Sequence, residues 1–248
     1  MKATVIIPAR YSSTRFPGKA LVSIGTKPII QWIYDAAKMS SHAENVIVAT
    51  DEQKIYDTVR GFGGNVIMTS SGLRTGSDRC AEVARQLSAG IIINLQADEI
   101  LQGPEMIDEL IQMMEEDEAI GMGSLKSEIT SPEELLDRNV VKVVTDNNDY
   151  ALYFSRSPIP HIRDRRDNSL FTPKTYYKHL GIYAFRRDFI LLFSSLPTSN
   201  LEELEKLEQL RVLECGYRIK LKETSHKSFR IDTPEDLKKL EEGLNHGQ

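Results

Sequence analysis

The run Ile-Ile-Ile-Asn-Leu at residues 91–95 decides the fold class of this 248-residue chain. It is apolar at almost every position, whereas a strand with one face in solvent alternates between apolar and polar residues. Such a strand is covered on both faces, which is typical of a parallel sheet between layers of helices. Similar runs at 4–7, 46–49 and 66–68 are each followed by a helical pattern. The first half is therefore predicted to form a doubly wound α/β sheet.

The second half of the chain has a different pattern. Residues 140–145 and 150–154 predict a β-hairpin, and residues 179–185 predict a further strand. Residues 201–215 predict one helix, for which Gly216 is a suitable stop. No repeat, low-complexity tract or clear linker divides the chain, so we expect a single unit.

The composition is that of an ordinary globular protein, with 40% hydrophobic and 27% charged residues. A formal net charge of −5 does not favour binding to a polyanion. The apolar start is too short for a secretory signal, and no run approaches the roughly 20 residues that span a bilayer. Cys80 and Cys215 give neither a disulfide framework nor a metal-binding spacing. We expect a soluble cytoplasmic protein.

A basic loop follows the first strand, with the sequence PARYSSTRFPGK at residues 8–19. The chain carries five positive charges and no acid before Asp35. In open α/β sheets, ligands bind beyond the carboxyl ends of the strands. Arginine offers paired donors to phosphate oxygens, and lysine offers a point charge. The loop therefore predicts a triphosphate site, although it matches neither the Walker pattern nor the dinucleotide pattern G-x-G-x-x-G.

The segment IPARYSSTRFPGKAL, residues 7–21, resembles the N-terminal signature of the 3-deoxy-manno-octulosonate (Kdo) cytidylyltransferases, the CMP-Kdo synthetases. The similarity continues in order through most of the chain, in VIVATD (46–51), NLQADE (94–99), VKVVTDNNDYALYFSRSPIP (141–160), HLGIYAF (179–185), LEKLEQLRVLECG (204–216) and DTPEDL (232–237). The resemblance implies a nucleotidyltransferase-type, GT-A-like fold: a mostly parallel sheet flanked by helices. It also implies transfer of CMP from CTP to Kdo, with release of pyrophosphate, for lipopolysaccharide biosynthesis.

Two aspartates are candidates for a metal site. Asp98 follows the strand at 91–95, and Asp232 precedes a proline-initiated helix. By its residues alone, Asp232 is better explained as a helix cap than as a metal ligand. The resemblance implies that Asp98 and Asp232 hold Mg²⁺, the one cofactor expected.

The metal loop departs from the family pattern. Gln96-Ala97-Asp98-Glu99-Ile100 stands where Gln-Gly-Asp-Glu-Pro is common. Ala97 adds a methyl group that disfavours positive φ, and Ile100 loses the fixed turn of proline. We expect a change in local geometry or sugar preference more than in activity.

The resemblance also assigns the residues that bind the substrates. Residues 69–79 form a hydroxyl- and glycine-rich segment that, by itself, favours a plain surface loop over a binding loop. The implied CTP contacts are Pro8, Ala9, Arg10, Ser13, Arg15, Lys19, Ser71, Gly76, Arg79 and Gln96, of which Arg10, Arg15 and Lys19 act in catalysis with Asp98. The implied sugar contacts are Gln96, Arg156, His179, Tyr183, Glu208 and Gln209.

One nucleotidyltransferase domain is expected over residues 1–248. Residues 1–138 and 190–248 would form the nucleotide-binding core, and residues 139–189 a smaller α+β part for sugar binding and homodimer formation. The partners are then CTP and an eight-carbon acid sugar, with neither nucleic acid nor membrane.

Other functions remain open from the sequence. The same reaction on 8-amino-3,8-dideoxy-Kdo, sialic acid or another acid sugar is the nearest alternative. A nucleotide-sugar glycosyltransferase is more remote, because such enzymes typically carry Asp-x-Asp where this chain has Asp98-Glu99. A non-catalytic nucleotide-binding module is the least favoured alternative, because the complete set of charged groups is typical of an enzyme.

Overall fold

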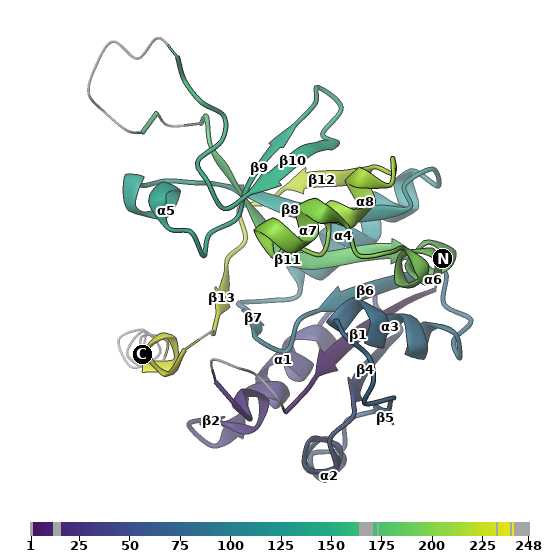
Figure 1. Cartoon of the computed structure of the whole chain (residues 1–248). Coiled ribbons are helices and arrows are strands. Elements are labelled where there is room, and N and C mark those ends of the chain that lie inside the picture. Colours follow the sequence, from purple (N-terminus) through teal and green to yellow (C-terminus); the bar gives the residue numbers. More distant parts are fainter. Residues whose placement is uncertain are drawn as a thin grey trace.

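A computed structural model describes residues 2–11, 16–163, 171–172, 174–231, 233–238 and 240. Within these residues, the centre of the molecule is a mixed sheet of nine strands. Its order is β10–β9–β11–β6–β1–β4–β5, and β8 pairs with both β11 and β12 (Figure 1). The GT-A-like α/β fold expected from the sequence is confirmed.

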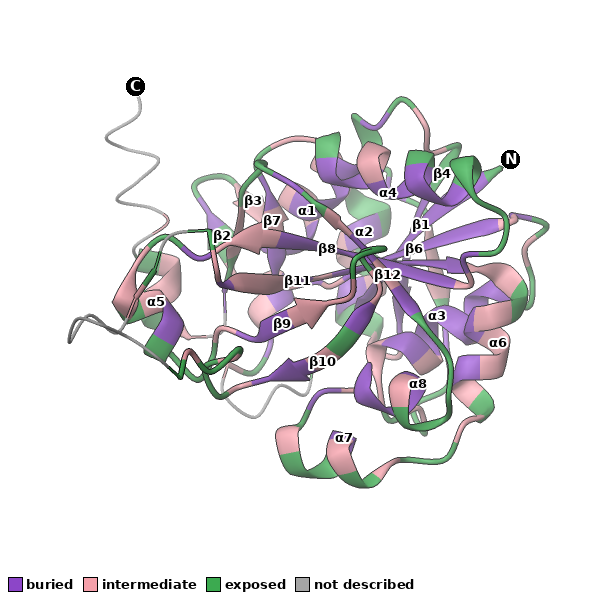
Figure 2. Cartoon of the chain, turned by 90° about the horizontal axis from the view of Figure 1, so that it is seen from above, coloured by how far each residue is buried: buried purple, intermediate pink, exposed green. Residues whose placement is uncertain are grey.

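One half of the sheet is parallel. It contains β1 (Ala3–Ala9), β4 (Asn45–Thr50), β5 (Val66–Met68) and β6 (Ile91–Leu95). All seven residues of β1 and all five of β6 are buried (Figure 2). The continuous apolar runs are therefore strands covered on both faces, as predicted.

Helices cover both faces of this parallel half. One face packs on α1 (Ile29–Lys38), α2 (Gln53–Gly61) and α4 (Glu105–Glu116). The opposite face packs on α3 (Gly76–Ala84) and α6 (Arg187–Ser195). Alternate residues of β1 enter the two apolar clusters, with Val5 in one and Ile6 in the other.

The other half of the sheet is largely antiparallel. It contains β8 (Met122–Glu128), β9 (Lys142–Thr145), β10 (Ala151–Ser155), β11 (Tyr177–Arg186) and β12 (Ile219–Glu223). The predicted hairpin is present as β9 and β10. The long strand β11 joins the halves, because it pairs with β6 along one edge and with β8 along the other.

The single helix predicted at residues 201–215 is wrong. The chain instead forms α7 (Asn200–Glu205) and α8 (Leu210–Glu214), separated at Lys206, which has a left-handed conformation with φ 55° and ψ 46°. The leucines at every third position could not all face one core from a straight helix. The break leaves Leu204 72% exposed and buries Leu207 to 6%.

Short elements complete the fold. A 3-10 turn, η1 (Lys19–Leu21), precedes the small hairpin of β2 (Ser23–Ile24) and β3 (Lys27–Pro28), and α5 (Pro132–Leu136) precedes β9. A separate two-stranded sheet pairs β7 (Glu99–Leu101) with β13 (Ser228–Arg230). In the described part of the chain, no helix is both long and apolar enough to cross a bilayer.

Candidate active site

A cavity of about 310 Å³ lies beyond the carboxyl ends of β1, β5 and β6, where ligands bind in open α/β sheets. Eight residues predicted for the site line it: Arg10, Gly76, Gln96, Asp98, Arg156, Tyr183, Glu208 and Gln209. A neighbouring cavity of about 210 Å³ shares Tyr183 and Gln209 and adds His179. The structure thus brings most predicted residues together around two adjoining cavities.

Three distant segments meet at Asp98. The Lys19 ammonium donates to the Asp98 carboxylate at 2.6 Å and to the carbonyl of Ile231 at 3.1 Å. The backbone N–H of Ile231 donates to the carbonyl of Asp98 at 2.9 Å. Asp232, the next residue, lies outside the described residues, as do Ser13 and Arg15 of the phosphate loop. Thr233 caps the following turn through a reciprocal pair of bonds with Asp236.

The β7–β13 pair produces this convergence. Glu99 lies opposite Arg230, and Ile100 lies opposite Phe229. Ile100 therefore belongs to a strand, and Ala97, whose φ is not positive, packs in the core at 9% exposure. The departures from Gly and Pro fit this geometry without strain.

Arg230 is a residue that the sequence analysis missed. Its guanidinium lies 3.9 Å from the Asp98 carboxylate, and its side chain lines both cavities. The available signal was its position two residues before Asp232.

The start of α3 forms the wall of the cavity near the basic loop. A Cβ on Gly76 would lie 3.0 Å from the Gln96 amide oxygen and 3.2 Å from the Pro8 ring. Glycine therefore permits this close approach without displacing Gln96 or Pro8. Arg10 donates from Nη1 to the carbonyl of Arg74 at 3.1 Å, which ties the basic loop to the segment before α3. Ala9 ends β1 in the core, and Ser71 is exposed.

Arg79 lies beneath this segment and does not line the cavity. It is 2% exposed and donates to the hydroxyl of Thr69 and to the carboxylate of Asp51, the latter at 2.9 Å. These contacts support the loop from below. A direct contact of Arg79 with CTP stays a prediction.

A chain of hydrogen bonds crosses the floor of the larger cavity. Gln96 donates to Asn94 at 2.9 Å, Asn94 donates to Ser77 at 3.0 Å, and Ser77 donates to Glu208 at 2.7 Å. Burial raises the pKa of the Glu208 carboxyl, and the hydroxyl of Ser77 opposes that shift. The network fixes the orientation of the Gln96 amide.

The predicted sugar residues lie on β11 and at the break between α7 and α8. The Tyr183 hydroxyl donates to the side-chain oxygen of Gln209 at 3.2 Å. Gln209 is 2% exposed, and its amide nitrogen has no hydrogen-bond partner among the described residues. Burial, followed by the charge of Glu208, raises the pKa of Tyr183 well above its usual value.

Arg156 stabilises the break between α7 and α8 and also lines the larger cavity. Its guanidinium donates to the carbonyls of Glu205 at 2.7 Å, Arg138 at 2.9 Å and Lys206 at 3.5 Å. All three of its guanidinium nitrogens therefore donate to backbone carbonyl groups. The arginine predicted to contact the sugar therefore also shapes the segment that carries Glu208 and Gln209.

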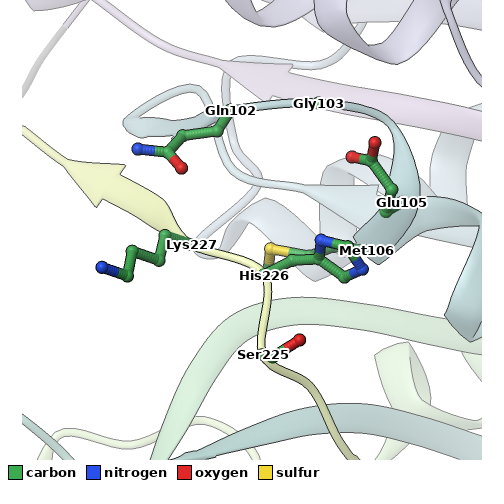
Figure 3. A pocket seen from close by; sticks show the side chains of 7 residues that line it. All are labelled: Gln102, Gly103, Glu105, Met106, Ser225, His226 and Lys227. Atoms are coloured by element: carbon green, nitrogen blue, oxygen red, sulfur yellow. The ribbon is translucent and has the colours of Figure 1, made fainter.

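A separate pocket of about 280 Å³ lies between the start of α4 and residues 225–227, at the far end of the β7–β13 pair (Figure 3). Its residues include Glu105 and His226, but none of the predicted site residues. This pocket is therefore distinct from the two cavities that the predicted residues line. Within the described residues, no group of three or more His, Cys, Asp or Glu side chains could bind a metal.

A sequence model of the cytidylyltransferase family matches residues 4–225. Fold and site thus define this chain as a cytidylyltransferase, an enzyme of the nucleotidyltransferase class. A 3-deoxy-manno-octulosonate cytidylyltransferase of Geobacter metallireducens is 51% identical over 100% of both chains. One from Solibacter usitatus is 47% identical over 95% of this chain and 91% of its own. The chain belongs to the family of 3-deoxy-manno-octulosonate cytidylyltransferases.

One solved structure supports this assignment, and a second shares the fold. CMP:2-keto-3-deoxy-manno-octonic acid synthetase, solved in complex with CTP, matches with a TM-score of 0.91 at 40% identity, over 100% of both chains. The 4-diphosphocytidyl-2C-methyl-D-erythritol synthase of Anaerococcus prevotii shares the fold, with a TM-score of 0.64 at 14% identity over 98% of both chains.

Proposed function

We propose that this protein transfers CMP from CTP to the anomeric hydroxyl of Kdo, with release of pyrophosphate, for lipopolysaccharide biosynthesis. The observation that carries the proposal is the meeting of Lys19, Asp98 and the Ile231 backbone at the rim of a polar cavity. The full-length relatives named for this reaction support the same substrate.

The basic loop binds the triphosphate in this proposal. Arg10 and Lys19 reach the cavity rim from residues that follow β1, and Arg15 and Ser13 belong to the same loop. Cations at the β- and γ-phosphates stabilise the charge that moves onto pyrophosphate as the bond to the α-phosphate breaks. No covalent enzyme intermediate is required.

Magnesium is part of the proposal, with Asp98 and Asp232 as the residues that would hold it. The observed chemistry fits, because Mg²⁺ takes one or two carboxylates together with phosphate oxygens and waters. The Asp98 carboxylate is 17% exposed and faces the cavity. When bound, Mg²⁺ would polarise the α-phosphate and lower the pKa of the attacking hydroxyl. Lys19 neutralises Asp98 in the free protein and is positioned to turn to phosphate.

The sugar is proposed to occupy the part of the site between β11 and the α7–α8 break. Gln96, Tyr183, Glu208 and Gln209 present neutral and acidic hydrogen-bonding groups there, and Arg156 and Arg230 supply positive charge for the carboxylate. A site of this kind rejects analogues that lack a hydroxyl, because its own polar groups would then lose their partners.

A pyrophosphate-release assay tests the proposed reaction. Purified protein would be given CTP, Mg²⁺ and one sugar at a time: Kdo, 8-amino-3,8-dideoxy-Kdo or sialic acid. We expect the highest kcat/KM with Kdo and loss of turnover when Mg²⁺ is removed with chelator. Faster turnover of another acid sugar would overturn the substrate assignment, and CTP binding without pyrophosphate release would overturn the reaction.

We also propose that the enzyme works as a homodimer in the cytoplasm. The proposed use of CTP supports this location. The part of the chain over residues 139–189 is the proposed site of the two-fold contact. Sedimentation that gives only monomer at working concentrations would contradict the dimer.

A further inference from the structure

Strand β11 contains a β-bulge beside the sugar side of the site. It pairs with β8 through Leu180 and Leu125, but the next pair joins Tyr183 to Ser124, so Gly181 and Ile182 have no partner of their own on β8. Bulges interrupt the ladder of backbone hydrogen bonds and commonly re-aim side chains next to active sites. Ser124, which is 0% exposed, lies at this interruption.

The hydroxyl of Ser124 has three polar neighbours. Its oxygen lies 2.8 Å from the carbonyl of Ile182, 3.1 Å from the carbonyl of Leu180 and 2.9 Å from Nε2 of His179. A serine hydroxyl has one proton to donate, and carbonyl oxygens only accept. The proton must therefore point at the two carbonyls, and the hydroxyl has only lone pairs left for the imidazole. Nε2 of His179 must then carry a proton of its own.

We propose that Ser124 is a positioning residue that holds His179 in the Nε2–H tautomer, so that Nδ1 accepts a hydrogen bond from a hydroxyl of the acid sugar. The inference rests on the proposed function for the identity of the ligand. The tautomer itself follows from the contacts of the Ser124 hydroxyl alone.

The surroundings of the ring support this role. Phe154 packs edge-on at 4.9 Å between ring centres, and Tyr183 packs against it at 5.3 Å, so the imidazole plane is held on two sides. Among the described residues, Ser124 supplies the one side-chain hydrogen bond to the ring. The ring also lines the 210 Å³ cavity together with Gln209. Of the two ring nitrogens of His179, Nδ1 is therefore the one left for a ligand in this cavity.

The proposed tautomer gives His179 a different role from that of the arginines in binding the sugar. Burial, followed by the positive charge of Arg230, lowers the pKa of His179 to about 3, so the ring is neutral when it binds ligand. A neutral acceptor repels a carboxylate and attracts a hydroxyl. His179 then selects for a hydroxyl, and the sugar carboxylate is left to the arginines of the site.

Nitrogen NMR of the full-length protein labelled with ¹⁵N-histidine tests the tautomer directly. Long-range proton–nitrogen spectra of the ligand-free wild type at neutral pH should show His179 protonated at Nε2 and unprotonated at Nδ1. A wild-type spectrum with the proton on Nδ1, or with an imidazolium, would overturn the proposal. This measurement does not depend on activity.

Substitutions identify Ser124 as the cause. Ser124→Ala should convert the His179 signals to a mixture of tautomers, whereas Ser124→Thr, which keeps the hydroxyl, should retain the wild-type pattern. Ser40→Ala is the matched control, because Ser40 is a buried serine that bonds to Asp108. Wild-type signals in folded Ser124→Ala would refute its role, and if that variant does not fold, the wild-type and Thr spectra still decide.

Kinetics connect the tautomer to sugar binding. Ser124→Ala should raise KM for Kdo about tenfold, as expected for a weakened hydrogen bond, while KM for CTP stays within about twofold. Equal losses for both substrates would contradict a role in sugar positioning. If the wild type turns over no acid sugar, the proposed function fails, and the NMR result still stands or falls separately.

Discussion

The two halves of the sheet bind their proposed ligands by different means. In the parallel half, the groups at the strand ends are charged and reach the rim, as Lys19 and Asp98 do. In the antiparallel half, neutral groups lie within β11 and at a helix break, as Tyr183 and Gln209 do, beside the charged Glu208 and Arg156. Charge tolerates small displacements, whereas neutral hydrogen bonds require accurate placement. The comparison implies that nucleotide binding tolerates change in its scaffold better than sugar selection does.

The largest effect is expected for Asp98→Ala. Loss of this carboxylate should reduce kcat for pyrophosphate release at least about a hundredfold, comparable to the loss of a preorganised electrostatic group. Asp35→Ala is a suitable control, since Asp35 forms an exposed pair with Lys27 at 2.7 Å. Near wild-type turnover in Asp98→Ala would remove this residue from the catalytic centre.

Lys19→Ala should act mainly on the use of CTP. We expect KM for CTP to rise about tenfold, because one cation of the triphosphate site is lost, with a smaller effect on KM for Kdo. Lys27→Ala, also a cation before Asp35 but paired with it, serves as the control. Unchanged CTP kinetics in Lys19→Ala would show that the basic loop has another purpose.

Gln209→Ala should impair the use of Kdo more than the use of CTP, the reverse of what we expect for Lys19→Ala. The variant removes an amide that faces both cavities, so KM for Kdo should rise about five- to tenfold while KM for CTP changes little. Steady-state kinetics with each substrate varied in turn provide the measurement. A rise in KM for CTP alone would reverse the assignment of the two halves.

The smallest effect concerns the pH dependence of stability. His179 has a pKa of about 3 in the folded protein, against a value near 6.5 in the unfolded chain, so unfolding takes up a proton between these values. The free energy of unfolding should therefore fall as the pH drops below about 6.5, by at most about 1.4 kcal/mol per pH unit from this group. Urea titrations at pH 7 and pH 5 should show a smaller fall for His179→Gln than for the wild type.

Sequence reasoning succeeded where structure is local. The strands at 66–68 and 91–95 were predicted with the boundaries that the structure shows. Each strand and the helix after it have a hydrophobic pattern that can be recognised within a short stretch of sequence. The proximity of Lys19 to Asp98 also follows from the alternation of strands and helices. Both residues come after parallel strands, whose carboxyl ends lie at the same edge of the sheet.

Long-range pairing explains what the sequence did not reveal. Strand β8 and the β7–β13 pair escaped prediction, and with them Ser124 and Arg230. Strands β7 and β13 have three residues each, too few to show an alternating pattern, and β8 contains no β-branched or aromatic residue, so these strands are recognised only by their pairing. The break at Lys206 was missed for a similar reason. The leucine pattern continues through it, and the buried Glu202–Arg211 ion pair that joins α7 to α8 is a tertiary contact.

The pairing of β7 with β13 has a consequence for synthesis of the enzyme. Asp98 is held by backbone and side-chain contacts to Ile231 and Lys19, so its surroundings are incomplete until residues 228–231 have left the ribosome. A nascent chain that already holds the whole parallel half would possess the basic loop without an ordered acidic partner. The proposed metal-binding rim at Asp98 is therefore completed by a segment that is synthesised long after the basic loop and Asp98 itself.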